Sequence, residues 1–223
     1  MMSEPLTVLM LGLFGGAAAI DGTSFGQFMI SRPLVAATLA GAIVGDPIHG
    51  AVIGGILEAF HLSVLPVGAA KYPEGGPAAV AGGAAYATSD LAASTLLLTV
   101  AIVLGLEWIG GESVRLLRQF NVRLVHEHGG KALTQTSLQY RHLSAIGIDF
   151  VRGMVLVLAG TAALVGVLSS LMPYWGLGEQ IPQILLSAIV AGLLASTYRS
   201  FGDRRWMATA GVAAGAVFVL LVR

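Results

Sequence analysis

The stretch from Ser31 to Glu74 constrains the fold more than any other part of the chain. It consists mostly of Gly, Ala and branched aliphatic residues, which belong in lipid or in the core of a membrane protein. Yet it also contains Arg32, Asp46, His49, Glu58, His61, Lys71 and Glu74, and prolines at 33, 47, 66 and 73 divide it into short pieces. Transporters use apolar half-helices, broken by Gly and Pro with charges at the breaks, to hold a polar solute inside a bilayer.

Composition predicts an integral membrane protein. Only 11% of its residues are charged and its mean hydropathy is +0.82, whereas soluble domains have about 25% charged residues. The 30 glycines fit the close helix packing found in membranes. The zero net charge argues against a nucleic-acid partner. The absence of Cys excludes disulfides and thiolate chemistry.

The first 90 residues predict broken helices. The apolar run 6–20 is shorter than the roughly 20 residues of a bilayer crossing and breaks at the polar turn 21–24. We interpret it as a membrane-embedded element and not as a signal peptide, because Glu4 precedes it and no basic residue does. Runs 33–44 and 50–57 are shorter still. We expect them to be re-entrant or tilted segments shielded by protein.

The rest of the chain predicts longer helices. Residues 75–88 read as a packed half-helix or a hinge, and 91–109 as a span with Trp108 as an interfacial anchor. The polar region 110–152 predicts an amphipathic helix on the membrane surface or an extended cytoplasmic arm. Three further spans are expected within 153–223, at 153–172, 182–198 and 206–222. The predicted fold class is therefore an all-α polytopic integral membrane protein with a single domain, 1–223.

The basic residues predict the orientation of this protein. Of the twelve Lys and Arg residues, six lie in 110–152 and three in 199–205. Two predicted crossings separate these regions, so both fall on one side, which the positive-inside rule makes cytoplasmic.

The chain lacks the sequence motifs of the common catalytic machineries. It has no phosphate-binding glycine loop, no dinucleotide fingerprint, no HExxH and no GxSxG. The close pair His126 and His128 is interpreted as part of a solvated loop. We therefore expect no catalytic residues, no metal and no cofactor, and we interpret the chain as a non-catalytic translocation subunit.

One ordered signature links the chain to a known family. Arg32-Pro33-Leu34, Gly45-Asp46, the run Gly54-Gly55-Ile56-Leu57-Glu58, and Val67-Gly68-Ala69-Ala70 follow one another. This order resembles the IIC membrane component of the mannose-type bacterial sugar phosphotransferase system. The strongest part covers residues 32–73, and the later spans are compatible with the same family.

The resemblance implies a function that composition does not. A IIC component pairs with a IID membrane subunit in a larger oligomer in the bacterial inner membrane. Together they carry a hexose or amino sugar inward, and cytoplasmic IIA and IIB units phosphorylate it. An elevator-like movement of a core against a scaffold is also implied.

Two other functions stay open. Residues 26–31 read Gly-Gln-Phe-Met-Ile-Ser, where the family commonly has a more polar, acidic run. One alternative is therefore a IIC-like scaffold or regulatory subunit without sugar transport. The other is a stand-alone secondary transporter.

The candidate sugar-binding residues are Glu58, Gln27, Asp21, His61, Arg32 and Lys71. Glu58 leads because a carboxylate in an apolar, Gly-rich segment is costly, and bidentate acceptance from vicinal hydroxyls would justify it. Its alternative role is that of a buried ion-pair partner for Arg32 or Lys71. Asp46 is interpreted as a helix cap. Asp149 and Arg152, three residues apart, are expected to pair on one helix face.

Overall fold

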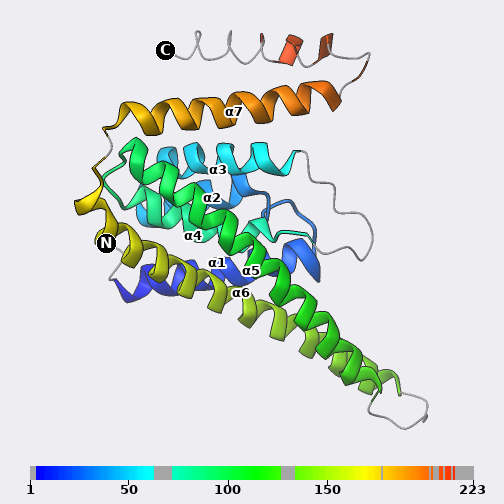
Figure 1. The fold of residues 1–223 in the computed structure, drawn as a ribbon. Helices are drawn as coiled ribbons and strands as arrows, with labels where there is room; N and C mark the ends of the chain where they lie inside the picture. The colour runs from blue at the N-terminus through cyan, green and yellow to red at the C-terminus, as the bar shows by residue number, and fades with distance from the viewer. Residues whose placement is uncertain are drawn as a thin grey trace.

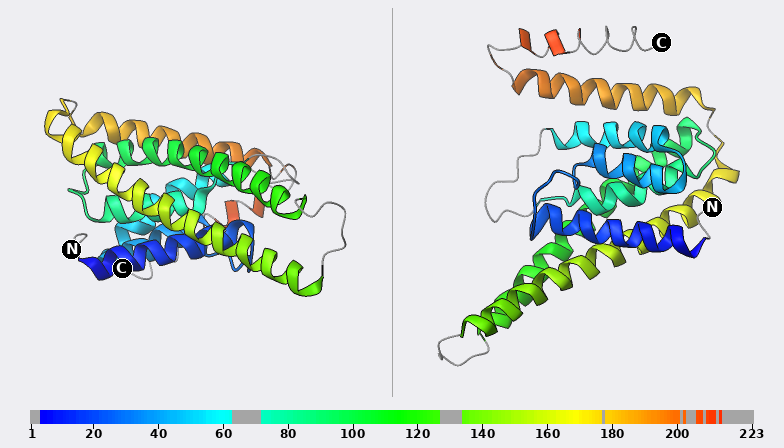
Figure 2. Two further views of the ribbon diagram at one scale, coloured as in Figure 1. Left: turned by 90° about the horizontal axis from the view of Figure 1, so that it is seen from below. Right: turned by 180° about the vertical axis from the view of Figure 1, so that it is seen from behind.

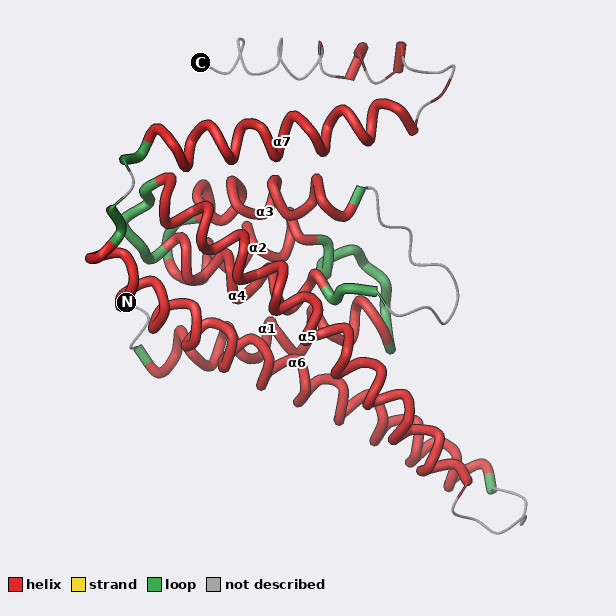
Figure 3. The backbone as a smooth tube through the Cα atoms, in the orientation of Figure 1, coloured by secondary structure: helices red, strands yellow, loops and turns green. Residues whose placement is uncertain are grey.

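The fold is described by a computed structural model, which covers residues 4–62, 72–126, 134–176 and 178–200 together with isolated positions between 202 and 213. Across these residues every regular element is helical, and Figure 3 shows helices joined by loops. Seven α-helices and one 3₁₀ turn follow one another: α1 (Pro5–Thr23), α2 (Pro33–Val44), α3 (Pro47–His61), α4 (Gly75–Ala87), α5 (Ala93–His126), α6 (Gln135–Leu171), η1 (Met172–Tyr174) and α7 (Gln180–Ser200). The predicted all-α fold is confirmed.

Four of these helices are long and apolar enough to cross a membrane: Pro5–Thr23, Ala93–Arg123, Gln135–Tyr174 and Gln180–Arg199. The short helices α2, α3 and α4 lie between them (Figure 1). The helix α1 extends through Thr23, so its end falls inside the predicted polar break. Most of the predicted span 206–222 lies outside the described residues.

Proline fixes the starts of the short helices. Pro33 and Pro47 each occupy a first-turn position of α2 and α3, where the missing N–H costs nothing. Between these helices Gly45 adopts φ 100°, a left-handed conformation in which a Cβ would be strained. The chain therefore reverses direction within two residues, and α2 and α3 form a tight antiparallel hairpin.

Small residues let the helices of the core approach closely. A Cβ on Gly41 of α2 would lie 3.0 Å from the Cα of Gly50 on α3, and one on Gly153 of α6 would lie 2.7 Å from the carbonyl oxygen of Gly15 on α1. Every residue of α4 from Gly75 to Tyr86 is buried. Because α4 is almost all Gly and Ala, it has little helix stability of its own and depends on the helices around it.

The helices α5 and α6 are longer than a bilayer requires, at 34 and 37 residues. The predicted boundaries at 109/110 and 152/153 fall inside them, so each helix runs unbroken from a predicted span into the polar region. Residues 115–126 of α5 and 135–147 of α6 extend side by side beyond the bundle (Figures 1 and 2). We call this pair the arm, and the end of the bundle from which it leaves the arm end.

The opposite end of the bundle, which we call the far end, holds the starts of α1, α3, α5 and α7 and the ends of α2, α4 and α6 (Figure 1). The two ends differ in charge. All the described arginines belong to the arm end: Arg32, Arg115, Arg118, Arg123, Arg141, Arg152 and Arg199. Among the described residues, the far end carries the carboxylates of Glu4, Asp46, Asp90 and Glu179, and no Lys or Arg.

Candidate functional site

A cavity of about 130 Å³ lies at the arm end, where α1, α2, α3 and α4 meet. We call it the arm-end cavity. Its lining combines an arginine, a histidine and a glutamate with glycines and prolines: Ala18, Gly22, Thr23, Ser31, Arg32, Pro33, His61, Tyr72, Pro73, Glu74, Gly75, Gly76 and Pro77. Two of the predicted site residues, Arg32 and His61, are therefore brought together here.

Glu58 lies beside the arm-end cavity and forms an ion pair with Arg32. Its second carboxylate oxygen accepts the backbone N–H of Leu34 at 3.3 Å. The α2–α3 hairpin produces this contact, because it brings the end of α3 next to the start of α2. The side chain of Glu58 is only 17% exposed, while that of Arg32 is 40% exposed. The two groups thus present a carboxylate acceptor and a guanidinium donor side by side.

His61 ends α3 and contacts a different carboxylate. Its Nε2 lies 3.0 Å from Oε1 of Glu107 on α5, whose side chain is 3% exposed. The imidazole also packs against the backbone at Gly75, where a Cβ would lie 2.8 Å from Nε2. His61 therefore joins α3 to α5 at the start of α4.

Asp21 organises the loop between α1 and α2. Its carboxylate is 3% exposed and accepts the backbone N–H groups of Phe28 and Ser31, the second at 2.9 Å. These bonds support a turn in which Gly26, Gln27 and Met29 all have positive φ. Both oxygens of Asp21 thus accept hydrogen bonds from the loop, which gives this residue a structural role there.

The remaining predicted residues lie elsewhere. Gln27 is exposed on the loop with φ 55° and does not line the arm-end cavity. Lys71 lies outside the described residues. Asp46 accepts the N–H of His49 at 3.1 Å and contacts its ring Nδ1 at 2.6 Å. It therefore caps α3, as interpreted from the sequence.

A buried ionic cluster lies where the arm joins the bundle. Arg152 donates to both carboxylate oxygens of Glu74 at 2.6 Å, to Asp149 Oδ1 at 2.7 and 2.9 Å, and to the hydroxyl of Ser113 at 2.7 Å. Thr23 and Ser24 at the end of α1 both donate to Asp149. We call Arg152, Glu74, Asp149 and Ser113 the junction cluster.

The sequence indicated only part of the junction cluster. The spacing of Asp149 and Arg152 predicts their pairing, and the structure shows it. Glu74 directly follows Pro73 in the sequence. It is 78 residues away from Arg152 in the chain, and no local pattern marks the two as partners.

None of these residues forms a metal site. Within the described part of the chain, no group of three His, Asp or Glu side chains is placed to hold a metal ion. The arm-end chemistry consists of hydrogen-bond donors and acceptors, which suits recognition of a polar solute.

Comparison with known proteins places this geometry in a family. The model of the phosphotransferase system sorbose-specific IIC component matches residues 5–197. The sorbose-specific EIIC component of Klebsiella pneumoniae is 25% identical over 174 residues, which cover 75% of this chain and 64% of that protein. The fructose permease IIC component of Bacillus subtilis is 26% identical over 189 residues, which cover 84% of this chain and 65% of that protein. The mannose-specific EIIC component of Escherichia coli K12 is 32% identical over 89 residues, which cover 40% of this chain and 27% of that protein. This chain thus spans less than two thirds of these relatives.

Solved structures share the fold. A chain described as a membrane protein matches with a TM-score of 0.74 at 19% identity, covering 98% of this chain and 94% of that one. A chain from the cryo-EM structure of the mannose transporter ManYZ with microcin E492 matches with a TM-score of 0.61 at 20% identity. The match covers 96% of this chain and 87% of that one. These likenesses support the arrangement of the helices. The family match over most of the chain carries the conclusion that this protein belongs to the IIC membrane components of the mannose-type sugar phosphotransferase systems.

Proposed function

We propose that this chain is the translocation subunit of a phosphoenolpyruvate-dependent sugar phosphotransferase system in a bacterial inner membrane. With a IID-like membrane subunit it carries a hexose or amino sugar inward, and cytoplasmic IIA and IIB proteins phosphorylate the sugar. The related proteins named for sorbose, mannose and fructose support a sugar as the solute. The concentration of arginines at the arm end supports a cytoplasmic arm.

The Arg32–Glu58 pair beside the arm-end cavity is the observation that carries this proposal. A carboxylate and a guanidinium side by side can accept from one hydroxyl of a sugar and donate to the next. Both lie in the segment whose motifs match the family, at the ends of short helices held inside the bundle. Because the side chain of Arg32 is 40% exposed, the ion pair itself contributes only about 0–1 kcal/mol of stability, so stability alone does not account for it.

The size of the arm-end cavity adds a condition. Its volume of about 130 Å³ is smaller than the roughly 300 Å³ at which small-molecule pockets begin. A sugar therefore enters only when Arg32 and Glu58 separate, and its hydroxyls then replace the ion pair. In this mechanism the pair closes the empty site and the sugar opens it.

The test is sugar uptake by cells that carry Glu58→Gln in this chain together with its partner subunits. Gln keeps the size and one acceptor oxygen but loses the charge, so we expect uptake to be abolished while membrane insertion and assembly are retained. Glu112→Gln is the matched control, because Glu112 also pairs with an arginine, Arg115, but neither residue lines the cavity. Normal uptake by a correctly inserted Glu58→Gln protein contradicts the site. Absence of uptake by the unsubstituted protein with its partners favours a scaffold instead.

A further inference from the structure

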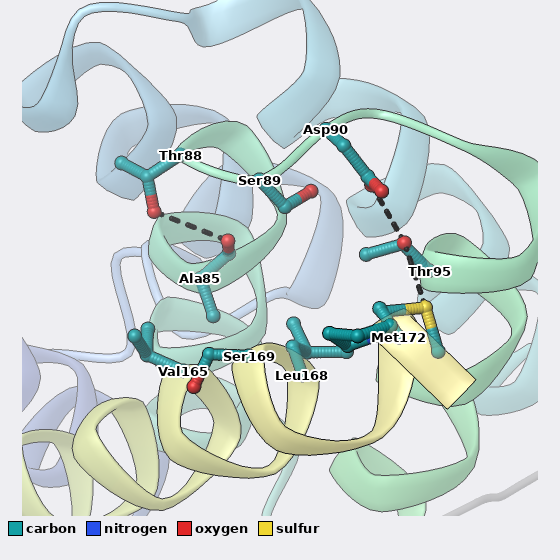
Figure 4. A pocket seen from close by; sticks show the side chains of 10 residues that line it. Ala85, Thr88, Ser89, Asp90, Thr95, Val165, Leu168, Ser169 and Met172 are labelled. Atoms are coloured by element: carbon teal, nitrogen blue, oxygen red, sulfur yellow. Dashed lines mark hydrogen bonds between the residues drawn. The ribbon is translucent and has the colours of Figure 1, made fainter. Parts of the chain in front are cut away.

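A second, larger cavity opens at the far end, between the end of α4, the start of α5 and the end of α6 (Figure 4). We call it the far-end cavity. Its volume of about 430 Å³ lies within the range of about 300–1,000 Å³ typical of small-molecule sites. An apolar floor is combined with hydroxyls and one carboxylate in its lining: Ala85, Thr88, Ser89, Asp90, Thr95, Val165, Leu168, Ser169, Met172 and Pro173.

The hydroxyl groups of the far-end cavity have already used their protons. Thr88 donates to the carbonyl of Ala84 at 2.9 Å, and Ser169 donates to that of Gly166 at 3.0 Å. A hydroxyl has one proton to donate and two lone pairs to accept with. Thr88 and Ser169, both exposed, therefore offer acceptor oxygens to anything that enters.

Asp90 adds a charged acceptor. Its Oδ1 accepts from the hydroxyl of Thr95 at 2.6 Å and from the N–H of Ala92 at 3.2 Å. Its Oδ2 has no partner among the described residues, and the side chain is exposed on the cavity rim. The far-end cavity thus presents acceptors to a ligand, and one of them is anionic.

The charges around the far-end cavity have the same sign. Glu179 lies close by, because it accepts from Ser94 at the start of α5, and Asp46 caps α3 at this same end. The described residues place no Lys or Arg here. An anion entering the cavity would meet like charges, whereas a cation would find a carboxylate with a free oxygen.

We propose that the far-end cavity is a binding site for a small hydroxylated primary amine, such as an aminated polyol. Its ammonium group donates to Asp90 Oδ2 and its hydroxyls donate to Thr88 and Ser169, while its carbon chain lies against Val165 and Leu168. A charge-assisted bond to Asp90 is the strongest of these contacts. A phospholipid headgroup fits less well, because its phosphate needs a cation that the described far end lacks.

This site is separate from the proposed sugar site. The helix α4 forms a wall of both cavities, and Pro77 at one end is about 12 Å along the helix axis from Ala85 at the other. Neither Arg32 nor Glu58 approaches the far-end cavity. Failure of sugar uptake would therefore leave the far-end proposal standing, and Glu58→Gln should bind the amine normally.

The first test compares two ligands that differ in one group. D-glucamine and D-sorbitol have the same carbon chain, and glucamine carries an ammonium where sorbitol carries a hydroxyl. We expect calorimetric titration of the purified protein to show binding of glucamine that is stronger than that of sorbitol by about tenfold or more, the effect of a charge-assisted bond. Asp90→Asn should remove that preference while its side-chain oxygen still accepts from Thr95. Equal affinities for the two ligands, or no binding of glucamine, would overturn the proposal.

The second test blocks the cavity. Ser169 lines it, whereas its neighbour Ser170 does not, although both are exposed and both donate to the carbonyl of Gly166. Ser169→Leu should abolish glucamine binding and Ser170→Leu should leave it unchanged. Equal binding by the two variants would refute the location. A phospholipid that copurifies with the unsubstituted protein and with Ser170→Leu, but not with Ser169→Leu, would reassign the cavity to a lipid headgroup.

Discussion

Replacement of Arg152 by Gln tests whether the junction cluster holds the arm helices to the core. The change removes the cation that the described structure places between Glu74 and Asp149, whose side chains are 5% and 0% exposed. Two carboxylates then share a buried site without a counter-charge. Breaking a buried ion pair in this way costs about 3–5 kcal/mol, a large part of the roughly 5–15 kcal/mol that stabilises a typical protein.

The matched control is Arg115→Gln. Arg115 is the first residue of the arm, but its side chain is 45% exposed and it makes a pair with Glu112 on the same helix face. Exposed pairs contribute about 0–1 kcal/mol. The two substitutions thus remove the same charge from the same part of the fold and differ in burial and partners.

Thermal unfolding of the purified variants, followed by helical circular dichroism, measures the difference. At about 2–4 °C per kcal/mol for a chain of this size, Arg152→Gln should lower the midpoint by about 6–20 °C. Arg115→Gln should lower it by no more than about 4 °C. Adding Glu74→Gln to Arg152→Gln should restore part of the loss, because one uncompensated charge disappears. Equal shifts for the two arginine variants would refute the reasoning.

Two further predictions concern the far end and the orientation. Hydrogen bonds from the hydroxyl and N–H of Ser94 and from the N–H of Ala93 lower the pKa of Glu179 below its usual value of 4.5. The carboxylate therefore stabilises the fold fully above pH 4.5, and this stabilisation is lost as the pH falls through the lowered pKa. At neutral pH the unsubstituted protein should have a higher melting temperature than Glu179→Gln. In acid, below the lowered pKa, the two melting temperatures should be equal. Because the chain has no Cys, a single cysteine introduced at Leu116 or at Ser170 shows on which side of the membrane that position lies. A membrane-impermeant thiol reagent should label Ser170→Cys, and not Leu116→Cys, in intact cells. Labelling of Leu116→Cys instead would mean that the arm lies outside the cell.

Local signals in the sequence predicted the short helices well. Pro33 and Pro47 mark the starts of α2 and α3, and the Gly–Ala segment 75–88 corresponds to α4. These features act through backbone geometry within a few residues, so they can be predicted from the local sequence without knowledge of the tertiary structure. The cap at Asp46 and the pairing of Asp149 with Arg152 are local in the same sense.

Contacts between distant segments were harder to predict. The sequence suggested that Glu58 either contacts the sugar or pairs with Arg32 or Lys71. In the structure the α2–α3 hairpin brings Glu58 next to Arg32, and the two form an ion pair. Glu107, which lies within the predicted span 91–109, is the partner of His61, 46 residues away. Choosing such a pair from many possible ones requires knowledge of which helices are neighbours, and hydropathy does not contain it.

The length of α5 shows why a polarity change is a poor guide to a helix end. The sequence turns from apolar to charged after Trp108, and two glycines follow, yet the helix continues to His126. Gly110 and Gly111 are needed because Glu74 and the Tyr72 carbonyl lie against them. Beyond them Val114 and Leu117 are buried, so apolar contacts continue into the charged part. Packing therefore continues this helix past the predicted end of the span.

The two ends of the molecule act as separate electrostatic environments although the net charge of the chain is zero. From Glu74 at the start of α4 to its last residue, Ala87, the rise is about 20 Å, whereas exposed charges are screened within about 8–10 Å at physiological salt. The arginines of the arm end therefore do not neutralise the carboxylates of the far end. At the arm end, Arg32, Arg115 and Arg152 are paired with carboxylates of the same end, and the carboxylates of the far end keep their own charge, as the proposed amine site requires. In the proposed orientation, the same separation of charge that places the arm in the cytoplasm also favours a cation at the far-end cavity.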